Sequence, residues 1–283
     1  KEGTEFVHNN QGKIYITVNM IPHNDDFVGL KQYLHQLKEI GVDGLIVSDP
    51  GVINIIKQED INIPLHLSTQ ANVVNTESVR FWDQQGLERI ILARELSQSE
   101  IKEINKKTRI ALEIFVHGSM CISYSGRCML SNYMVNRDPN RGKCAHSCRW
   151  KYYLVEEKRP NEYYPVIEGD DSTHIMNSKD LCLIENIPEI IDTGVASLKI
   201  EGRMKGIHYV ATVTDIYRKA LDSYFMDPQN YKFQSDWLRE LKKISHRGYT
   251  TGFFLGSPGS EDHNYESSAY SRTYDFMGIV RDY

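Results

Sequence analysis

The sequence predicts an α/β fold in which parallel strands and their covering helices form a (β/α)8, TIM-like barrel. Short runs of β-branched residues alternate with helical patterns along most of the chain. Successive runs begin about 20 to 30 residues apart, and this interval favours a barrel over a doubly wound sheet. No glycine-rich phosphate-binding sequence follows a strand, which argues against a dinucleotide-binding fold. About seven βα units can be counted, so we expect the barrel to be N-terminally incomplete.

The individual elements follow in order from these patterns. We assign strands to short apolar runs that end in polar residues or glycine, because runs that are apolar throughout are typical of parallel strands covered on both faces. They are residues 13–19, 43–48, 65–68, 88–93, 109–116, 174–177 and 196–201. We assign helices where apolar residues recur with a period of about 3.6 residues. They are residues 27–40, 53–57, 76–85, 98–106, 181–193 and 207–224.

The predicted domains follow from the same pass along the chain. We expect the barrel to span residues 1–226, with a cysteine-rich insertion at residues 118–173. Residues 227–262 are predicted to form a helical extension, and residues 263–283 the start of a C-terminal β domain. Because the missing βα units precede the first strand and the final β-type run stops abruptly, we expect the chain to be a fragment.

The composition is that of an ordinary globular protein. Of the 283 residues, 40% are hydrophobic and 25% are charged, and the formal net charge is −5. No apolar run approaches the roughly 20 residues that cross a bilayer, and residues 1–11 lack the apolar core of a signal peptide. Five cysteines without an export signal predict a reducing, cytoplasmic location. Since the chain has no overall basic balance, a nucleic-acid role requires a local basic patch.

Four of the five cysteines fall within one 28-residue window, at Cys121, Cys128, Cys144 and Cys148, and Cys182 follows at a distance. The alternatives are buried thiols without a metal, a zinc site and an iron–sulfur cluster. Zinc sites usually contain paired C-x2-C sequences, which this chain lacks. Wide gaps between thiolates suit a 4Fe-4S cluster, so we predict that metal site.

Two cysteines, Cys182 and Cys148, are candidates for the fourth ligand of this predicted cluster. Cys182 is predicted to start a helix directly after a strand, where the helix N-terminus favours a thiolate. Cys148 is followed by a run that resembles a strand leading away from the site. We therefore predict ligation by Cys121, Cys128, Cys144 and Cys182, with Cys148 as the alternative.

In barrels the chemistry lies where strands end in βα loops, and the predicted strands here end in polar residues. We expect these residues to converge on one face beside the cysteines. They are Asn19, His23, Asn24, Asp25, Ser48, Asp49, Ser68, Thr69, Gln70, Glu113, His117, Asn177, Ser178, Lys179, Asp180, Lys199, Glu201 and Arg203.

Five segments of the sequence resemble, in the same order, the collagenase-like peptidase family U32. They are residues 113–131, 136–150, 177–182, 197–205 and 245–253. The family is named for proteolysis, but its better-understood members are iron–sulfur proteins that hydroxylate RNA bases or a quinone precursor. The most similar group makes 5-hydroxyuridine at the tRNA wobble position with prephenate. The resemblance also implies a barrel followed by a small β domain.

The resemblance strengthens specific site assignments. We predict catalytic roles for Glu113, His117, Glu201 and Arg203, and co-substrate binding by Lys199, Ser68, Gln70 and Asn177. The alternative for Glu113 is a pair with a neighbouring Lys or Arg, and for His117 simple packing. Residues 199, 201 and 203 alternate along a predicted strand and would share one face, either as an ion-pair network or as an anion site for a dicarboxylate or a phosphate.

Residues 137–159 contain seven Lys or Arg against three acidic residues, interleaved with Trp150, Tyr152 and Tyr153. Phosphate contacts and an aromatic platform are what single-stranded RNA requires, although a solvated insertion has a similar composition. We predict that the protein binds the anticodon region of tRNA and the small carboxylate prephenate. We also predict that it forms a homo-oligomer, or a hetero-oligomer with a paralogous subunit.

Three functional classes remain open from the sequence. The first is an iron–sulfur enzyme that hydroxylates tRNA. The second is a peptidase, but the chain has no G-x-S-x-G or H-E-x-x-H sequence, and its Cys–His pairs lie within the predicted cluster motif. The third is a cluster-bearing scaffold for a partner subunit. We predict the first.

Overall fold

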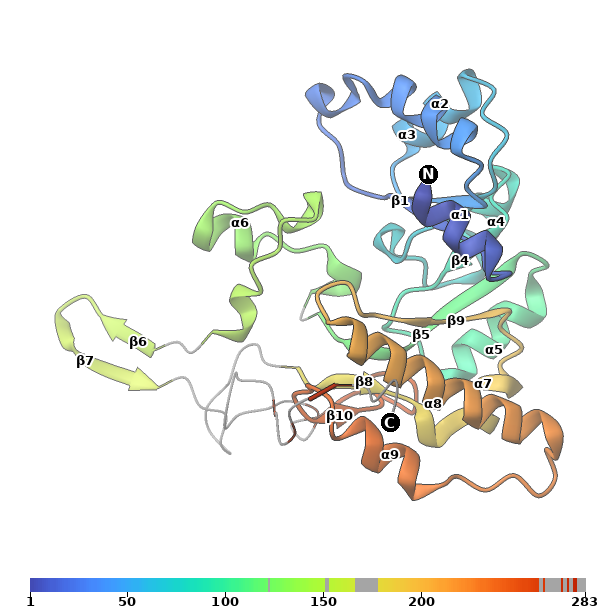
Figure 1. Cartoon of the computed structure of the whole chain (residues 1–283). Helices are drawn as coiled ribbons and strands as arrows, with labels where there is room; N and C mark the ends of the chain where they lie inside the picture. The colour runs from blue at the N-terminus through green and yellow to red at the C-terminus, as the bar shows by residue number, and fades with distance from the viewer. Residues whose placement is uncertain are drawn as a thin grey trace. The chain divides into compact units, whose positions relative to one another are not determined.

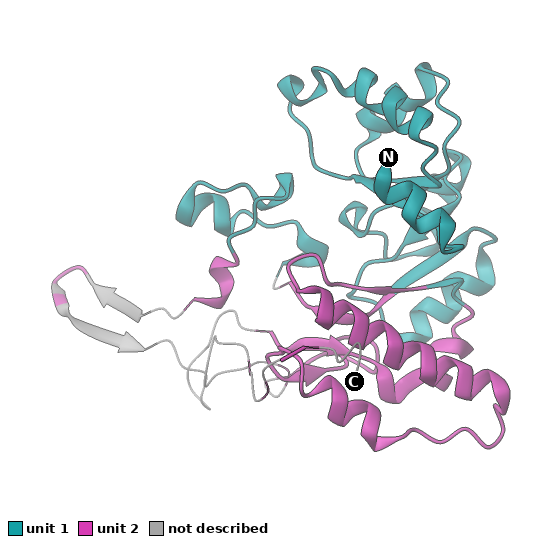
Figure 2. Cartoon of the chain, in the orientation of Figure 1, with its two compact units in different colours: residues 1–114, 123–145, 195–197 teal, residues 115–122, 146–194, 198–283 magenta. Residues whose placement is uncertain are grey.

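The computed structural model describes residues 1–121, 123–150, 153–165, 178–259, 262, 271, 274, 277 and 278. The chain forms two compact units (Figure 2). Unit 1 contains residues 1–114, 123–145 and 195–197, and unit 2 contains residues 115–122, 146–194 and 198–283. Strand β5 (Ala111–Ser119) begins in unit 1 and ends in unit 2.

Unit 1 is built on a parallel sheet in chain order (Figure 1). Its strands are β1 (Tyr15–Val18), β2 (Gly44–Val47), β3 (Leu65–Leu67), β4 (Arg89–Ile91) and the first half of β5. Every residue of β2 and β3 is buried, as expected for strands covered on both faces. Each of these strands falls within a run that the sequence predicts.

The helices of unit 1 are α1 (Glu2–Asn9), α2 (Leu30–Ile40), α3 (Pro50–Gln58), α4 (Thr76–Gln84) and α5 (Gln98–Lys107). The last three begin at residues whose side chains cap them. The Asp49 carboxylate accepts from the first turn of α3, Asn75 caps α4, and Ser97 and Glu100 form a capping box at α5. Local sequence therefore fixes where these three helices start.

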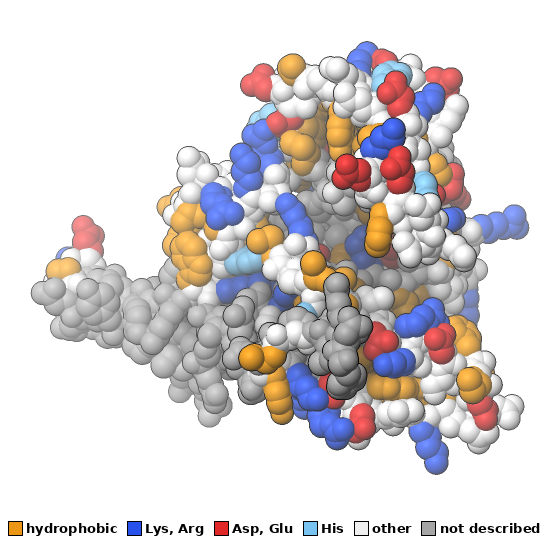
Figure 3. Space-filling view, viewed as in Figure 1, with side chains coloured by type: hydrophobic (Ala, Val, Ile, Leu, Met, Phe, Trp, Pro, Cys, Tyr) orange, Lys and Arg blue, Asp and Glu red, His pale blue; other side chains and the backbone are white. Residues whose placement is uncertain are grey.

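The remainder of unit 1 carries η3 (Tyr124–Gly126), α6 (Leu130–Val135) and η4 (Pro139–Arg141). Hydrophobic side chains gather on the surface of the segment that carries α6 (Figure 3). Met129 is 75% exposed and Tyr133 is 89% exposed.

Unit 2 contains a mixed group of strands. The second half of β5 pairs with β8 (Asp180–Cys182) in antiparallel register, and β8 pairs with β10 (Tyr249–Thr250) in parallel register. β9 (Ser197–Ile200) also pairs with β5. The helical elements are η5 (Ser147–Arg149), η6 (Ile184–Asn186), α7 (Ile187–Asp192), α8 (Ile207–Met226) and α9 (Ser235–Leu241). β6 (Tyr153–Glu156) and β7 (Arg159–Pro165) form a separate antiparallel pair.

These elements confirm an α/β fold with a mostly parallel sheet. The described strand pairings do not include one that closes a barrel, so closure stays a prediction. The helix predicted at residues 181–193 is wrong at its start, because Asp180–Cys182 pairs with β5 and α7 begins only at Ile187. The strand predicted at 174–177 lies outside the described residues, as does most of the run 274–283. No described helix is long and apolar enough to cross a membrane.

Candidate functional site

The end of β5 in unit 2 places His117 opposite Cys182 in the antiparallel register. The backbone N–H of Glu201, just after β9, donates to the carbonyl of His117 at 2.8 Å. Gly118 has a φ of +111°, and a Cβ there would lie 2.3 Å from the backbone oxygen of Glu201. Glycine is therefore required at this position, because both the positive φ and the close approach exclude a side chain.

His117 is fully buried and neutral. Burial lowers its pKa to about 3, and the positive charge of Lys205 contributes to a smaller extent. The Tyr217 hydroxyl donates to the Val116 carbonyl at 2.7 Å, so its 3.5 Å contact with His117 Nδ1 assigns the imidazole proton to Nδ1. Nε2 is then an acceptor, and it has no hydrogen-bond partner among the described residues. This arrangement supplies a neutral hydrogen-bond acceptor, whose lowered pKa makes it a weak base at neutral pH.

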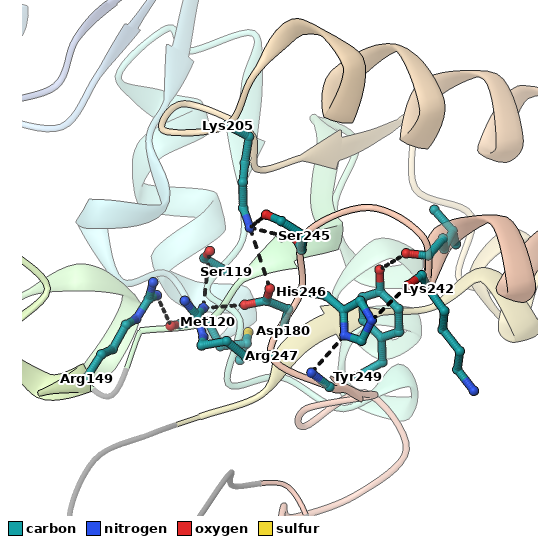
Figure 4. Close-up of polar contacts among 12 residues, drawn as sticks. Ser119, Met120, Arg149, Asp180, Lys205, Lys242, Ser245, His246, Arg247 and Tyr249 are labelled. Carbon is teal, nitrogen blue, oxygen red and sulfur yellow. Dashed lines mark hydrogen bonds and ion pairs between the residues drawn. The ribbon is translucent and has the colours of Figure 1, made fainter. Parts of the chain in front are cut away.

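A buried ion-pair network surrounds Asp180 in β8 (Figure 4). Arg247 Nη2 donates to Asp180 Oδ1, and Lys205 Nζ lies 3.9 Å from Oδ2. Lys205 also donates to the Ser245 carbonyl at 3.0 Å, and Arg247 Nη2 donates to Ser119 Oγ at 3.3 Å. Because these charged groups are buried, the network depends on all three of them, and removal of one would leave its neighbours without that interaction.

A second bond fixes the backbone next to two of the cysteines. Arg149, which follows Cys148, donates through Nη2 to the carbonyl of Met120 at 3.2 Å (Figure 4). Met120 immediately precedes Cys121. Within unit 2, the segments that carry Cys121 and Cys148 are therefore joined by a side-chain bond.

All five cysteines are described, and none of them is part of a disulfide. Cys128 and Cys144 belong to unit 1, and Cys121, Cys148 and Cys182 belong to unit 2. Among the described residues, no three His, Cys, Asp or Glu side chains are grouped closely enough to hold a metal ion. The donors themselves suit a soft metal or an iron–sulfur cluster, because both bind thiolates.

The loop at Cys128 is held by a set of local bonds in unit 1. Asn140 Oδ1 accepts from the Cys128 N–H at 3.2 Å, and Asn140 Nδ2 donates to the Cys128 carbonyl at 2.9 Å. The Leu130 N–H donates to Cys128 Sγ at 3.3 Å. Hydrogen bonds of this kind to sulfur are among the features that tune iron–sulfur clusters, so the position fits a ligand.

The helix N-terminus predicted at Cys182 is not present. Cys182 ends β8, and burial raises the pKa of its thiol to about 12. The reason for the error is that the strand pairing with β5 delays the following helix. Since a bound metal cation deprotonates a coordinating thiol, Cys182 can be a thiolate here only with such a compensating charge.

Glu113 lies in the part of β5 that belongs to unit 1. Its Oε2 is 3.2 Å from Arg89 Nη1, and the Arg89 guanidinium also lies 5.7 Å from the centre of the Tyr15 ring. The buried carboxylate is thus paired with a neighbouring arginine, which is the structural alternative that the sequence left open.

The alternation predicted for Lys199, Glu201 and Arg203 ends early, because β9 stops at Ile200. Lys199 Nζ lies 5.6 Å from the centre of the Phe115 ring. Glu201 Oε1 accepts from the backbone N–H of Arg203 at 2.9 Å. The prediction that the three side chains share one strand face is therefore wrong, since two of them lie in the turn after the strand.

Polar residues at the ends of β1, β2 and β3 converge in unit 1. Ser48 Oγ donates to the Asn19 carbonyl at 2.8 Å, and Asn19 Nδ2 donates to Ser68 Oγ at 3.0 Å. The side-chain oxygen of Gln70 is buried beyond Ser68 without a hydrogen-bond partner in the described part of the chain. Asn177, the remaining predicted co-substrate residue, lies outside the described residues.

Part of the predicted RNA-binding insertion is described. Trp150 is 45% exposed, as a stacking platform requires. Arg141 is paired with Asp26 in unit 1, and Arg149 is bonded to the Met120 carbonyl in unit 2. Lys151 and Tyr152 lie outside the described residues, and so does the side chain of Tyr153.

Four residues of this region had no individual role predicted from the sequence: Lys205, Tyr217 and Arg247, and Asp180, which was expected only among the polar residues at strand ends. Three of these residues lie within segments that carry the family resemblance, 177–182, 197–205 and 245–253. The resemblance therefore pointed to the segments that contain these residues. It could not give the partner of each side chain, because the partners come from distant parts of the chain.

Comparisons with known proteins match residues 1–264 to the family model described as peptidase family U32. The chain is 48% identical to tRNA hydroxylation protein P1 of Bacillus subtilis, over 100% of this chain and 67% of the relative. It is 40% identical to tRNA hydroxylation protein P of Escherichia coli, over 90% of this chain and 64% of the relative. It is 34% identical to the 23S rRNA 5-hydroxycytidine C2501 synthase of Escherichia coli, over 90% of this chain and 38% of the relative. The chain thus spans about two thirds of the length of the tRNA hydroxylation relatives.

Proposed function

Because the chain belongs to peptidase family U32, we propose that it is an RNA hydroxylase that converts the wobble uridine of tRNA to 5-hydroxyuridine. The observation that carries this proposal is the 48% identity to a tRNA hydroxylation protein along the whole chain. A relative named for 5-hydroxycytidine synthesis in rRNA supports the broader chemistry, hydroxylation of a pyrimidine in RNA. The proposal includes a cytoplasmic location and a closed barrel.

The proposed co-substrate is prephenate, a small dicarboxylate. Lys199 and Arg203 would supply positive charge for its carboxylates. His117 would accept a hydrogen bond from a bound group through Nε2, since this nitrogen is a buried acceptor without a described partner. Glu201 is a neighbour of this site through its backbone bond to His117. Glu113 stays in the proposal as a more distant group, because it is paired with Arg89.

The proposed cofactor is a 4Fe-4S cluster bound by Cys121, Cys128, Cys144 and Cys182, with Cys148 as the alternative fourth ligand. Such a cluster supplies electron transfer when bound. The chain's own contribution is to hold the sulfur-bearing segments. Hydrogen bonds from Leu130 to Cys128, and from Arg149 to the carbonyl before Cys121, perform this function.

A peptidase function receives less support from the geometry. The pair formed by Cys182 and His117 resembles a Cys–His dyad by position. An active dyad needs a lowered thiol pKa, whereas burial raises the pKa of Cys182 to about 12 and lowers that of His117 to about 3. Both groups are therefore neutral, and neither is an activated nucleophile.

Binding to tRNA can be tested through the exposed indole of Trp150. Trp150→Ala should weaken binding by about 5- to 150-fold, because stacking of one base on an aromatic ring is worth about 1–3 kcal/mol. Filter binding across a salt series measures this loss, and Phe81→Ala, at an exposed aromatic residue of α4, is the control. Equal affinity for the two variants would remove Trp150 from the RNA surface.

Mass spectrometry of tRNA nucleosides from cells with and without the gene tests the activity itself. Loss of 5-hydroxyuridine with the gene is the expected result. If its level does not change, hydroxylation of the wobble uridine is not the function of this protein.

A further inference from the structure

A short turn of unit 1, residues 123–127, is bound to the loop that follows β3. Asn72 Nδ2 donates to the Tyr124 carbonyl at 3.0 Å. Arg127 Nε donates to the Gln70 carbonyl at 2.9 Å. Two separate residues of the turn are thus joined to two residues beyond the carboxyl end of the strand, on the side where parallel α/β folds bind their ligands.

The same turn is held by the carboxylate of Glu95, which lies in the turn that follows β4. Ser125 donates from its backbone N–H to Glu95 Oε1 at 2.7 Å and from its hydroxyl to Oε2 at 2.6 Å. Ser125 is buried and has a φ of +43°, a left-handed conformation that is uncommon for residues other than glycine. Both carboxylate oxygens are needed to maintain it, and strain held in this way is characteristic of ligand sites.

Two amide oxygens at this place are buried without hydrogen-bond partners in the part of the chain that the structure describes. They are Gln70 Oε1 and Asn72 Oδ1. The orientation of the Asn72 amide is fixed, because its Nδ2 donates to the Tyr124 carbonyl. Its oxygen can therefore only accept a hydrogen bond, and it requires an N–H or O–H donor. A buried acceptor without a donor costs free energy, so each such group calls for a partner.

The turn also presents an aromatic ring and a cation to solvent. The Tyr124 side chain is 50% exposed. Arg127 is exposed, and within the described part of the chain the Gln70 carbonyl is the acceptor of its guanidinium, which it engages through Nε. An exposed ring, a cation and oriented acceptors are the three elements that bind an unstacked nucleotide of single-stranded RNA.

We propose that Gln70, Asn72, Tyr124 and Arg127 form the binding site for the uracil nucleotide of the RNA substrate. The uracil N3–H donates one bifurcated hydrogen bond that the two buried amide oxygens share, the base stacks on Tyr124, and Arg127 contacts a phosphate. This inference rests on the proposed function, which supplies uridine as the substrate. It assigns Gln70 to the RNA base instead of the small co-substrate.

The test uses two anticodon stem-loops that differ only at the wobble position, one with uridine and one with N3-methyluridine, which lacks the N3–H. Wild-type protein should bind the uridine loop about tenfold more tightly, as expected for loss of a hydrogen bond in a buried site. Gln70→Ala and Asn72→Gly should each reduce this ratio to below about two. Glycine is used at position 72 because Asn72 has a φ of +57°.

Two further variants distinguish loss of the contact with the uracil base from a general loss of RNA binding. Tyr124→Ala should weaken binding of both loops equally and keep the ratio, because stacking does not depend on the N3–H. Gln84→Ala, at an exposed glutamine of α4, should behave as wild type. Thermal midpoints of all variants report whether the fold is retained.

A wild-type ratio near one, or a ratio that stays near ten in both amide variants, would overturn the inference. Because the assay measures binding, it does not depend on hydroxylation. If the ratios follow the expectation but tRNA from cells without the gene keeps its 5-hydroxyuridine, the proposed activity fails and the uracil site stands. If the ratios do not follow the expectation but 5-hydroxyuridine is lost with the gene, the uracil site is rejected and the proposed activity stands.

Discussion

Removal of the charge on Asp180 should destabilise the protein by about 3–5 kcal/mol, the usual cost of breaking a buried ion pair. Asp180→Asn keeps the shape of the side chain but removes the negative charge that Arg247 and Lys205 contact at this residue. Lys205 Nζ is 3.9 Å from Asp180 Oδ2, and at an effective dielectric constant of about 20 this pair alone is worth about 4 kcal/mol. The direct bond from Arg247 adds to this energy, and the cost of desolvating the three groups offsets part of it.

Urea unfolding followed by circular dichroism measures the effect, with the m-value as a check that the same surface is exposed. Asp215→Asn is the matched control, because Asp215 forms an exposed pair with Lys219 one turn away in α8 at 2.6 Å. That pair should contribute less than about 0.5 kcal/mol. If Asp180→Asn and Asp215→Asn differ by less than about 1 kcal/mol, the buried network does not stabilise unit 2 as described.

Three further predictions concern the same unit and its cysteines. Gly118→Ala should destabilise the fold by at least about 2 kcal/mol, because the new Cβ would contact the Glu201 backbone and the φ at this position is strained for alanine. A smaller loss of unfolding free energy in urea would show that the backbone there can relax. Tyr217→Phe should cost about 1 kcal/mol by removing the hydroxyl that bridges β5 and β8, and a midpoint equal to wild type would contradict this. Anaerobically prepared protein should contain about four irons per chain, which Cys182→Ser loses and Cys148→Ser keeps; the reverse pattern would assign the fourth ligand to Cys148.

The sequence was sufficient for the parallel half of the fold. Residues 43–48 and 65–68 are short apolar runs, and β2 and β3 lie within them with every residue buried. Helix starts such as Asp49–Pro50 and Ser97 are local signals, because a cap bonds only to its own first turn. Elements of this kind could be predicted because their determinants lie within a few residues of each other.

The antiparallel pairing of β5 with β8 could not be predicted in the same way. It depends on residues 117 and 182 meeting across 65 positions of the chain, and nothing local to Cys182 indicates a strand. The helical pattern after Cys182 was correct for α7 but was extended too far back. The environment of Cys182 was therefore predicted as a helix N-terminus when it is a buried strand end.

The sequence predicted which residues belong to the candidate site better than it predicted which residues they contact. His117 and Gln70 were identified from their positions at strand ends, and both have buried polar atoms without partners in the described part of the chain. Arg247 received no role, because its partner Asp180 is 67 residues away and the two meet only in the folded unit. A buried ion pair leaves no signature in either local sequence, so only the structure could join them.

The measurement that tests the central claim most directly is the 5-hydroxyuridine content of tRNA in cells that lack the gene and are complemented with defined variants. The wild-type protein should restore the modified nucleoside. His117→Phe, which keeps an aromatic ring but has no acceptor nitrogen, should not restore it, while Gln84→Ala should restore it fully. Western blotting shows whether the variants accumulate equally. Full restoration by His117→Phe, or 5-hydroxyuridine already present without the gene, would contradict the assignment of RNA hydroxylation to this site.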